Sequence, residues 1–192
     1  VTSLSPDQMQ GAESFQEDFF GRKAGLKVSG QLQAEIYALA LGRVYTFGPT
    51  FRAEDSNTSR HLAEFWMLEP EMAFCDLECD MALAEELVRN LVAGILKDCS
   101  AEVDLFDRFV AKGLRRRLDT IAGRPFTRIS YLEAIDTLIS SGAVFEFPVS
   151  WGVDLQSEHE RFLCEEVAGG AVIVYDYPKD IKPFYMRLND DD

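Results

Sequence analysis

Basic and aromatic side chains that could bind a nucleotide gather in the segment 51–65. Arg52 lies among apolar, strand-like residues, and Arg60, His61 and Phe65 follow a short polar stretch. An arginine in apolar surroundings is costly unless an anion pairs with it. The planar guanidinium matches phosphate oxygens, and an aromatic ring offers a face on which a base can stack. The segment therefore predicts a site that holds a nucleotide by its phosphates and its ring.

A simpler interpretation of these residues stays open. Arg52 could pair with Glu54, and Arg60 with Glu64, as surface ion pairs worth about 0–1 kcal/mol each. The sequence has neither of the common glycine-rich phosphate loops, so any phosphate would be held by side chains. It also shows no arrangement typical of a nucleophilic triad. The chemistry expected is alignment of reactants and neutralisation of charge at phosphorus.

Composition limits the class of protein. The 192 residues suffice for one domain with a core, and the net charge is −14. Such an acidic chain is not expected to bind nucleic acid by itself, although a few local contacts could still hold one. No apolar run approaches the roughly 20 residues of a membrane helix, and the first residues lack the order of a secretory signal. We expect a cytoplasmic protein, with an organelle matrix left open.

The elements that must position this chemistry begin with a hairpin. Residues 44–51 and 65–74 predict two strands joined by a long polar tip, with Glu69 and Glu71 on one face of the second strand. Before them, a short strand is expected at 26–29. The helix expected at 31–41 has its apolar residues at helical spacing, and these are Leu32, Ile36, Leu39 and Ala40.

Helices dominate the rest of the chain. We expect them at 80–97, 103–121 and 157–167, and a further one that Ser130 caps with Glu133 as a capping box. Late strands are expected at 171–175 and 184–188. Strands and helices are grouped rather than alternating, which favours an α+β fold.

The run TFGPTFRAEDSNTSRHLAEFWMLEPEMAF, at 46–74, closely resembles the second signature motif of class II aminoacyl-tRNA synthetases of the aspartyl, asparaginyl and lysyl subgroup. The block VSGQLQAE at 28–35 also agrees with this subgroup. The blocks VDLQSEHERFL, at 153–163, and YPKDIKPFYMRLND, at 177–190, are similar to the asparaginyl enzymes in particular. The resemblance implies an α+β catalytic domain with an antiparallel β-sheet flanked by helices. It also implies a ligase that activates asparagine with ATP and transfers it to tRNA(Asn).

The resemblance also implies roles for particular residues. Arg52 would be the catalytic residue, holding the α-phosphate as charge develops there. The implied ATP-binding residues are Arg52, Glu54, Arg60, His61 and Phe65. The implied amino-acid-binding residues are Ser29, Gln31, Glu35, Glu69 and Lys182, with Gln31 and Glu69 near the α-ammonium. The implied contacts with the tRNA acceptor end are Asp55, Ser56, Asn57 and Thr58.

Two positions favour asparagine over aspartate. Aspartyl enzymes carry a lysine where this chain has Ala34, followed here by Glu35, and an arginine where it has Lys182. A pocket with fewer cations and an added acid repels a carboxylate and suits an amide, whose NH₂ group can donate to Glu35. Two plainer interpretations remain open: Glu35 as a solvated helix residue, and Lys182 as a surface lysine.

The resemblance implies that the chain is the central part of a catalytic domain, 1–192, with the second motif. The first motif with its dimer interface, the third motif with a second ATP-binding arginine, and the anticodon-binding domain are not recognised. The expected partners are ATP, asparagine, tRNA(Asn) and a second subunit, with Mg²⁺ as a cofactor whose ligands lie mostly elsewhere. Such a piece is expected to be inactive alone. Alternatives are a non-catalytic module that binds a nucleotide or an amino acid, and an aspartyl-type or asparagine-synthetase-type relative.

Neither the cysteines nor a cluster of acids predicts a metal site. Cys75 and Cys79 are four residues apart without a completing pair, so we expect all four cysteines to be free thiols. The acidic block 154–160 could bind Mg²⁺, but acids at the first turn of a helix are the favoured interpretation. We expect no protein-bound metal from these residues.

Overall fold

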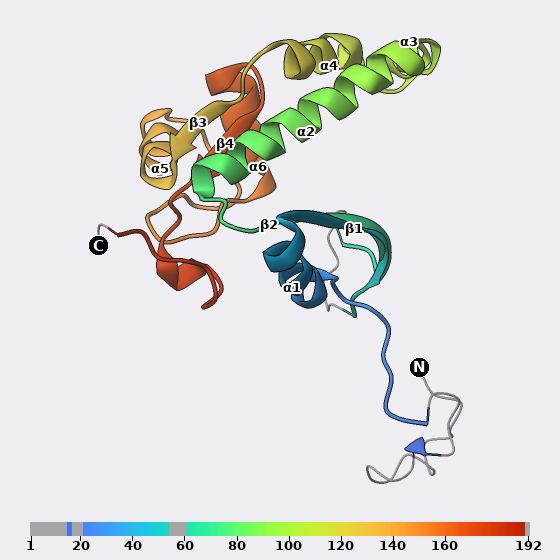
Figure 1. Ribbon diagram of the computed structural model, residues 1–192. Coiled ribbons are helices and arrows are strands. Elements are labelled where there is room, and N and C mark those ends of the chain that lie inside the picture. The colour runs from blue at the N-terminus through green and yellow to red at the C-terminus, as the bar shows by residue number, and fades with distance from the viewer. Residues whose placement is uncertain (1–14, 17–20, 54–60, 191–192) are drawn as a thin grey trace. The chain divides into compact units, whose positions relative to one another are not determined.

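The computed structural model describes residues 15–16, 21–53 and 61–190 (Figure 1). The chain divides into two compact units, Val1–Cys75 and Asp76–Asp192, each described by itself below. The first contains α1 (Gln31–Leu41), β1 (Arg43–Phe51) and β2 (Glu64–Met72). The second contains the remaining helices and two short strands. The predicted mixture of helices and grouped strands is confirmed.

In the first unit, β1 and β2 form the predicted antiparallel hairpin. Arg43 pairs with Met72 at one end and Phe51 with Glu64 at the other, so Thr46 lies opposite Glu69. The segment 26–29, predicted as a strand, is extended but forms no ladder. It is joined to the end of β1 by one backbone hydrogen bond, from Phe51 N to Lys27 O at 2.8 Å.

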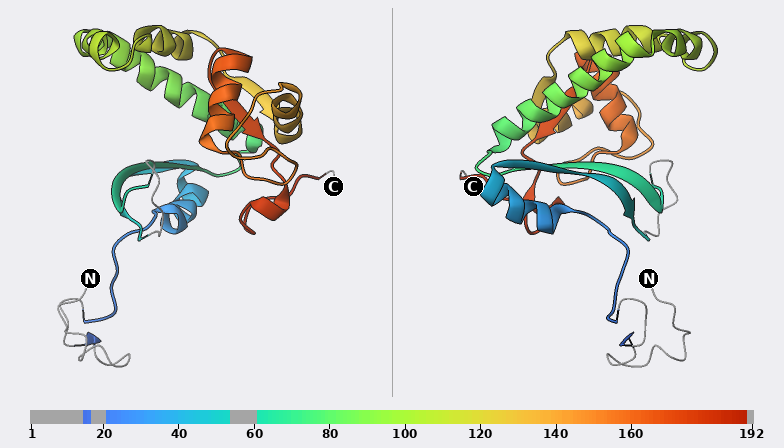
Figure 2. Two further views of the ribbon diagram at one scale, coloured as in Figure 1. Left: turned by 180° about the vertical axis from the view of Figure 1, so that it is seen from behind. Right: turned by 45° about the vertical axis from the view of Figure 1, so that its right-hand side comes forward.

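Helix α1 packs on the hairpin (Figure 2). Ala34 and Ala38, one turn apart, are each only 3% exposed. The helix predicted at 31–41 is confirmed, although Leu32, Ile36 and Leu39, whose spacing indicated it, are exposed in this structure. Two alanine methyl groups let the helix axis come close to the strands, which longer side chains would prevent.

The second unit begins with three helices. α2 (Leu77–Asp98) contacts α4 (Leu114–Gly123) and α3 (Ser100–Phe109). The single helix predicted for 103–121 is therefore broken into two. Gly113 lies at the break with a φ of +81°, a backbone conformation that glycine adopts without a Cβ clash.

The core of the second unit surrounds α5 (Tyr131–Ser140). Strands β3 (Thr127–Ser130) and β4 (Val172–Tyr175) pair in parallel beside it. Next come α6 (Ser157–Phe162), which continues into the π-helix η3 (Leu163–Ala168), and later the short 3₁₀ helix η4 (Lys179–Ile181). The buried core residues are Tyr131, Ala134, Ile135, Leu138, Leu155 and Leu163.

Three further local features differ from what the sequence led us to expect. Strand β3 was not predicted, and residues 184–188 form a turn followed by irregular backbone rather than a strand. Cys75 and Cys79 are disulfide-bonded, against the expectation of free thiols, whereas Cys99 and Cys164 are free.

None of the helices in the described residues is long and apolar enough to span a bilayer.

The capping box at the start of α5 is confirmed. Glu133 N donates to Ser130 Oγ at 3.2 Å, and the Glu133 carboxylate accepts from Ser130 N at 2.8 Å. The bond from the Ser130 backbone amide is the largest cause that lowers the pKa of Glu133, and the Ser130 hydroxyl, which donates to the same carboxylate oxygen at 2.8 Å, is the second. The cap fixes the start of the helix that carries most of the core.

We expect Ser130→Ala to lower the free energy of unfolding by about 1 kcal/mol, because a helix N-terminal amide loses its acceptor. Urea denaturation followed by circular dichroism measures this change. Ser140→Ala, at the other end of the same helix, is the control and should change stability by less than about 0.5 kcal/mol. Equal effects of the two substitutions would contradict the capping role.

Candidate functional site

One face of the hairpin carries the predicted nucleotide-binding and amino-acid-binding side chains in a row. Side chains on a strand alternate between faces, so Phe65, Met67 and Glu69 of β2 share one face. Their partners on β1 are Thr50, Gly48 and Thr46, which lie on the same face. The pairing of the strands therefore brings together residues about twenty positions apart in the sequence.

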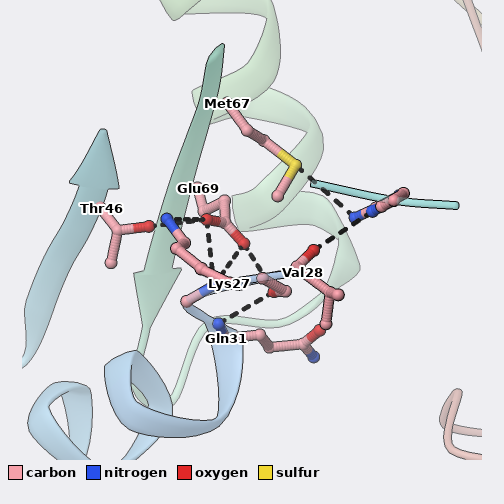
Figure 3. A network of polar contacts seen from close by, with 9 residues as sticks. Lys27, Val28, Gln31, Thr46, Met67 and Glu69 are labelled. Atoms are coloured by element: carbon pink, nitrogen blue, oxygen red, sulfur yellow. Dashed lines mark hydrogen bonds and ion pairs between the residues drawn. The ribbon is translucent and has the colours of Figure 1, made fainter. Parts of the chain in front are cut away.

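Glu69 is the most highly connected side chain of this face (Figure 3). Its Oε1 accepts from Ser29 Oγ at 2.6 Å and from Gly30 N at 3.0 Å. Its Oε2 accepts from Thr46 Oγ1 at 2.8 Å and from Gly30 N at 3.1 Å, and lies 3.2 Å from Lys27 Nζ. The carboxylate thus joins both strands to the segment that precedes α1.

These contacts keep Glu69 ionised. Burial by itself would raise the pKa of Glu69, because desolvation disfavours the charged form. Hydrogen bonds from Ser29, Thr46 and Gly30 and the ammonium of Lys27 outweigh that effect and lower the pKa from 4.5 to about 2. The group is a fixed anion with a 9% exposed side chain at any pH near neutrality.

Gly30 makes this arrangement possible by its lack of a side chain. It is buried at the start of α1, and a Cβ there would lie 2.7 Å from Thr46 Oγ1. The Ser29 hydroxyl also accepts from Gln31 N at 3.0 Å, which satisfies an amide of the first turn. The segment 29–31 therefore begins the helix and binds the Glu69 carboxylate at the same time.

Arg52 extends along the same side of the hairpin. Its Nε donates to Val28 O at 3.2 Å, and its Nη2 lies 3.7 Å from Met67 Sδ (Figure 3). The guanidinium carbon is 5.5 Å from the centre of the Phe65 ring. These contacts with described residues are all with neutral groups, so they orient the guanidinium without neutralising its charge.

The ring of Phe65, the guanidinium of Arg52 and the carboxylate of Glu69 follow one another along the hairpin. Along β2 the face presents an aromatic ring at Phe65, Arg52 beside Met67, and the Glu69 anion. Each two-residue step covers about 6.8 Å, so the ring and the anion start from backbone positions roughly 14 Å apart. A ligand with a ring, a phosphate and an ammonium in that order would meet a complementary group at each point.

The residues predicted to select the amino acid belong to two separate units. Gln31 Nε2 donates to Glu35 Oε1 at 2.9 Å, and both side chains are exposed on α1. Lys182 belongs to the second unit, where its Nζ lies 3.4 Å from Asp154 Oδ1 and 3.9 Å from the centre of the Tyr177 ring. Burial, with nearby acidic charges, raises the pKa of Tyr177 to about 12.

Several predicted site residues lie outside the described part of the chain. They are Glu54 and Arg60, predicted to bind ATP, and Asp55, Ser56, Asn57 and Thr58, predicted to contact tRNA. The alternative pairs Arg52–Glu54 and Arg60–Glu64 therefore stay untested. His61 is described; it is exposed and engaged in an interaction within the chain.

Sequence reasoning missed three residues that contact the Glu69 carboxylate, and these are Lys27, Gly30 and Thr46. Thr46 could have been found from the hairpin register, which places it directly opposite Glu69. Gly30 and Lys27 flank Ser29 closely, but nothing in their residue types indicates a shared acceptor. Their role depends on how the segment 27–30 lies against the strands.

The acidic block in the second unit has a structural role at Glu158. This residue lies in the first turn of α6, and its carboxylate accepts from Glu146 N at 3.0 Å and from Phe147 N at 2.7 Å. The bond from Phe147 is the largest cause that lowers the pKa of Glu158. Across the described ranges, no group of three or more His, Cys, Asp or Glu side chains could hold a metal ion.

His159, next in that block, is a buried structural residue. Its Nδ1 accepts from Gln156 N at 3.0 Å, and its Nε2 lies 3.0 Å from Phe147 O. These two contacts fit the neutral tautomer with the proton on Nε2. Both ring nitrogens are occupied within the unit, so the arrangement fixes a loop rather than exposing a base.

Comparison with known proteins extends the resemblance to nearly the whole chain. Residues 7–192 match the family model described as tRNA synthetases class II (D, K and N). A curated protein of Nitratidesulfovibrio vulgaris, named asparagine–tRNA ligase, is 62% identical over 100% of this chain and 42% of its own length. One of the same name from Desulfotalea psychrophila is 61% identical over 90% of this chain and 38% of its own length.

Solved structures of synthetases from the same family are also similar to this chain. The asparaginyl-tRNA synthetase of Pyrococcus horikoshii, complexed with asparaginyl-adenylate, is 42% identical, with a TM-score of 0.75 over 91% of this chain and 38% of that chain. An aspartyl-tRNA synthetase of Entamoeba histolytica is 28% identical, with a TM-score of 0.70 over 86% of this chain and 33% of its own. The chain spans about two fifths of the length of the curated relatives it matches. With the hairpin, its row of polar groups and this agreement over residues 7–192, the chain belongs to the class II tRNA synthetases of the D, K and N family.

Proposed function

We propose that this chain forms the part of an asparagine–tRNA ligase that binds ATP and asparagine. The observation that carries the proposal is the order of ring, cation and anion along the hairpin face. An asparaginyl-adenylate has its base, phosphate and ammonium in the same order. Close relatives named asparagine–tRNA ligase, and a similar structure that holds asparaginyl-adenylate, support the same assignment.

The proposed reaction needs no protein nucleophile. A carboxylate oxygen of asparagine attacks the α-phosphorus of ATP, and the bond to the bridging oxygen breaks to release pyrophosphate. Arg52 stabilises the charge that develops on the α-phosphate, and the Phe65 ring stacks on adenine. Glu69 binds the α-ammonium and holds the amino acid in line with the phosphorus. In the second step the tRNA hydroxyl takes the asparaginyl group, and AMP leaves.

Selectivity for asparagine is proposed to come from Glu35. The hydrogen bond from Gln31 to Glu35 supports this role, because it is an amide NH₂ group that donates to this carboxylate at 2.9 Å. The side-chain amide of asparagine offers the same donor, whereas the carboxylate of aspartate would be repelled. Lys182 is proposed as a second pocket residue. Its contacts with Asp154 and Tyr177 leave the surface-lysine interpretation open.

The remaining partners are part of the proposal. We propose that His61, Arg60 and Glu54 contact ATP, and that residues 55–58 meet the acceptor end of tRNA(Asn). A homodimer, a cytoplasmic location and a Mg²⁺ requirement follow the family expectation. The described residues contain no group of three or more His, Cys, Asp or Glu side chains that could hold this ion.

Isothermal titration calorimetry of this chain with ATP and with asparagine tests the proposal. We expect both ligands to bind, and asparagine to bind more tightly than aspartate. Preference for aspartate would favour an aspartyl-type or asparagine-synthetase-type relative. A chain that binds neither ligand would contradict the proposed function.

Arg52→Met is expected to weaken ATP binding by about tenfold or more, because a charged hydrogen bond to phosphate is lost. Calorimetric titration with ATP measures the change. Arg43→Met removes an exposed arginine at the other end of β1 and should leave the dissociation constant unchanged. If both variants lost the same affinity, Arg52 would contribute only to the general charge of the chain.

Glu35→Gln is expected to reduce the preference for asparagine over aspartate by about fivefold to tenfold, because the repulsion of a second carboxylate is removed. The ratio of the two dissociation constants is the measurement. The control is Glu86→Gln, which neutralises an exposed acid on α2. An unchanged ratio in Glu35→Gln would assign Glu35 to the solvated face of the helix instead.

A further inference from the structure

The Glu69 carboxylate has its acceptor positions filled by the chain itself. A carboxylate offers about four lone-pair sites on its two oxygens. Ser29, Gly30, Thr46 and Lys27 make five contacts with these oxygens, at 2.6 to 3.2 Å. An ammonium group that binds Glu69 from outside must therefore replace one of these donors.

Lys27 is the donor that can leave at the lowest cost. Its contact, 3.2 Å from Nζ to Oε2, is the longest of the five. The Gly30 amide is fixed at the start of α1, and the Ser29 hydroxyl is held between Glu69 and Gln31 N. The Lys27 side chain is 34% exposed and has a flexible four-carbon stem, so its ammonium can move into water.

Charge makes this exchange selective. Two ammonium groups on one carboxylate oxygen would repel each other, so an incoming cation and Lys27 cannot share the site. A ligand without a cation could not take the place of Lys27, because Glu69 would be left as a buried, unpaired anion. Exchange of the Lys27 ammonium for that of a ligand keeps the charge of Glu69 neutralised both in the free chain and in the complex.

We propose that Lys27 occupies the ammonium position of the amino-acid site, and that a ligand binds by displacing it. This inference rests on the proposed role of Glu69 in binding the α-ammonium. Lys27 then acts as an internal competitor: it weakens the binding of every amino-acid ligand and restricts the site to ligands that carry a primary ammonium. It therefore contributes to both affinity and specificity.

The test compares asparagine with succinamic acid, which has the same amide and carboxylate but no ammonium. We expect Lys27→Met to lower the dissociation constant of asparagine about twofold to fivefold, since the ammonium of Lys27 no longer competes for Glu69. Binding of succinamic acid should not tighten, because it has no group to place on Glu69. Isothermal titration calorimetry of the full chain measures both ligands.

Two further variants secure the result. Lys27→Gln should behave as Lys27→Met does, and thermal unfolding followed by circular dichroism shows whether each variant is folded. Lys23→Met removes an exposed lysine four residues away and should change neither constant.

The outcomes separate this inference from the proposed function. If wild-type chain binds asparagine and Lys27→Met binds it equally or more weakly, the displacement is wrong and the proposed function stands. If Lys27→Met bound asparagine and succinamic acid more tightly by the same factor, the displacement would also be wrong. The variant would then act only through the net charge near the site. If no variant binds asparagine, the proposed function fails and this inference fails with it.

Discussion

The first unit is organised around one buried anion. Glu69 accepts hydrogen bonds from a residue of β1 and from two residues that lead into α1, and it pairs with Lys27. An ionised carboxylate that is 9% exposed is stable only when such donors surround it. The contacts in turn fix the segment 27–30 against the strands. The same segment supplies Val28 O, which orients the Arg52 guanidinium. The cation and the anion of the site are thus positioned by adjacent residues.

The close approach at Gly30 explains why α1 packs as it does. Gly30 is in contact with Thr46, and one and two turns further along the helix Ala34 and Ala38 are the buried residues. Small side chains at this spacing keep the helix near the strands, and the larger Leu32, Ile36 and Leu39 are left exposed. The buried face of α1 is therefore the one that continues from Gly30 and the polar network, and not the one with the larger apolar side chains. A helix held in this way carries Gln31 and Glu35, the residues proposed to bind the amino acid, near the end of the face that holds Glu69.

Sequence reasoning succeeded where local chemistry determines structure. The hairpin followed from β-branched and aromatic residues on either side of a polar tip, and the cap of α5 from Ser130 and Glu133 at capping-box spacing. It failed where the structure depends on tertiary contacts or on the backbone conformation of a single residue. The break between α3 and α4 depends on a positive φ at Gly113, inside an otherwise helical pattern. Lys27 and Thr46 join the site only through the register of the strands and the path of the segment before α1. No local pattern contains that information.

The net charge of −14 would by itself argue against a site for a polyanionic nucleotide. The nucleotide site proposed on the hairpin depends on local charges rather than on this total. Among the described residues, Arg52 contacts a carbonyl, a thioether and an aromatic ring, all neutral, which fits its proposed role in binding a phosphate. The nearby Glu69 is already compensated by an ammonium and hydrogen-bond donors, which limits its repulsion of that phosphate. At this site, the neutral surroundings of the cation and the compensation of the anion therefore matter more than the excess of acids elsewhere in the chain.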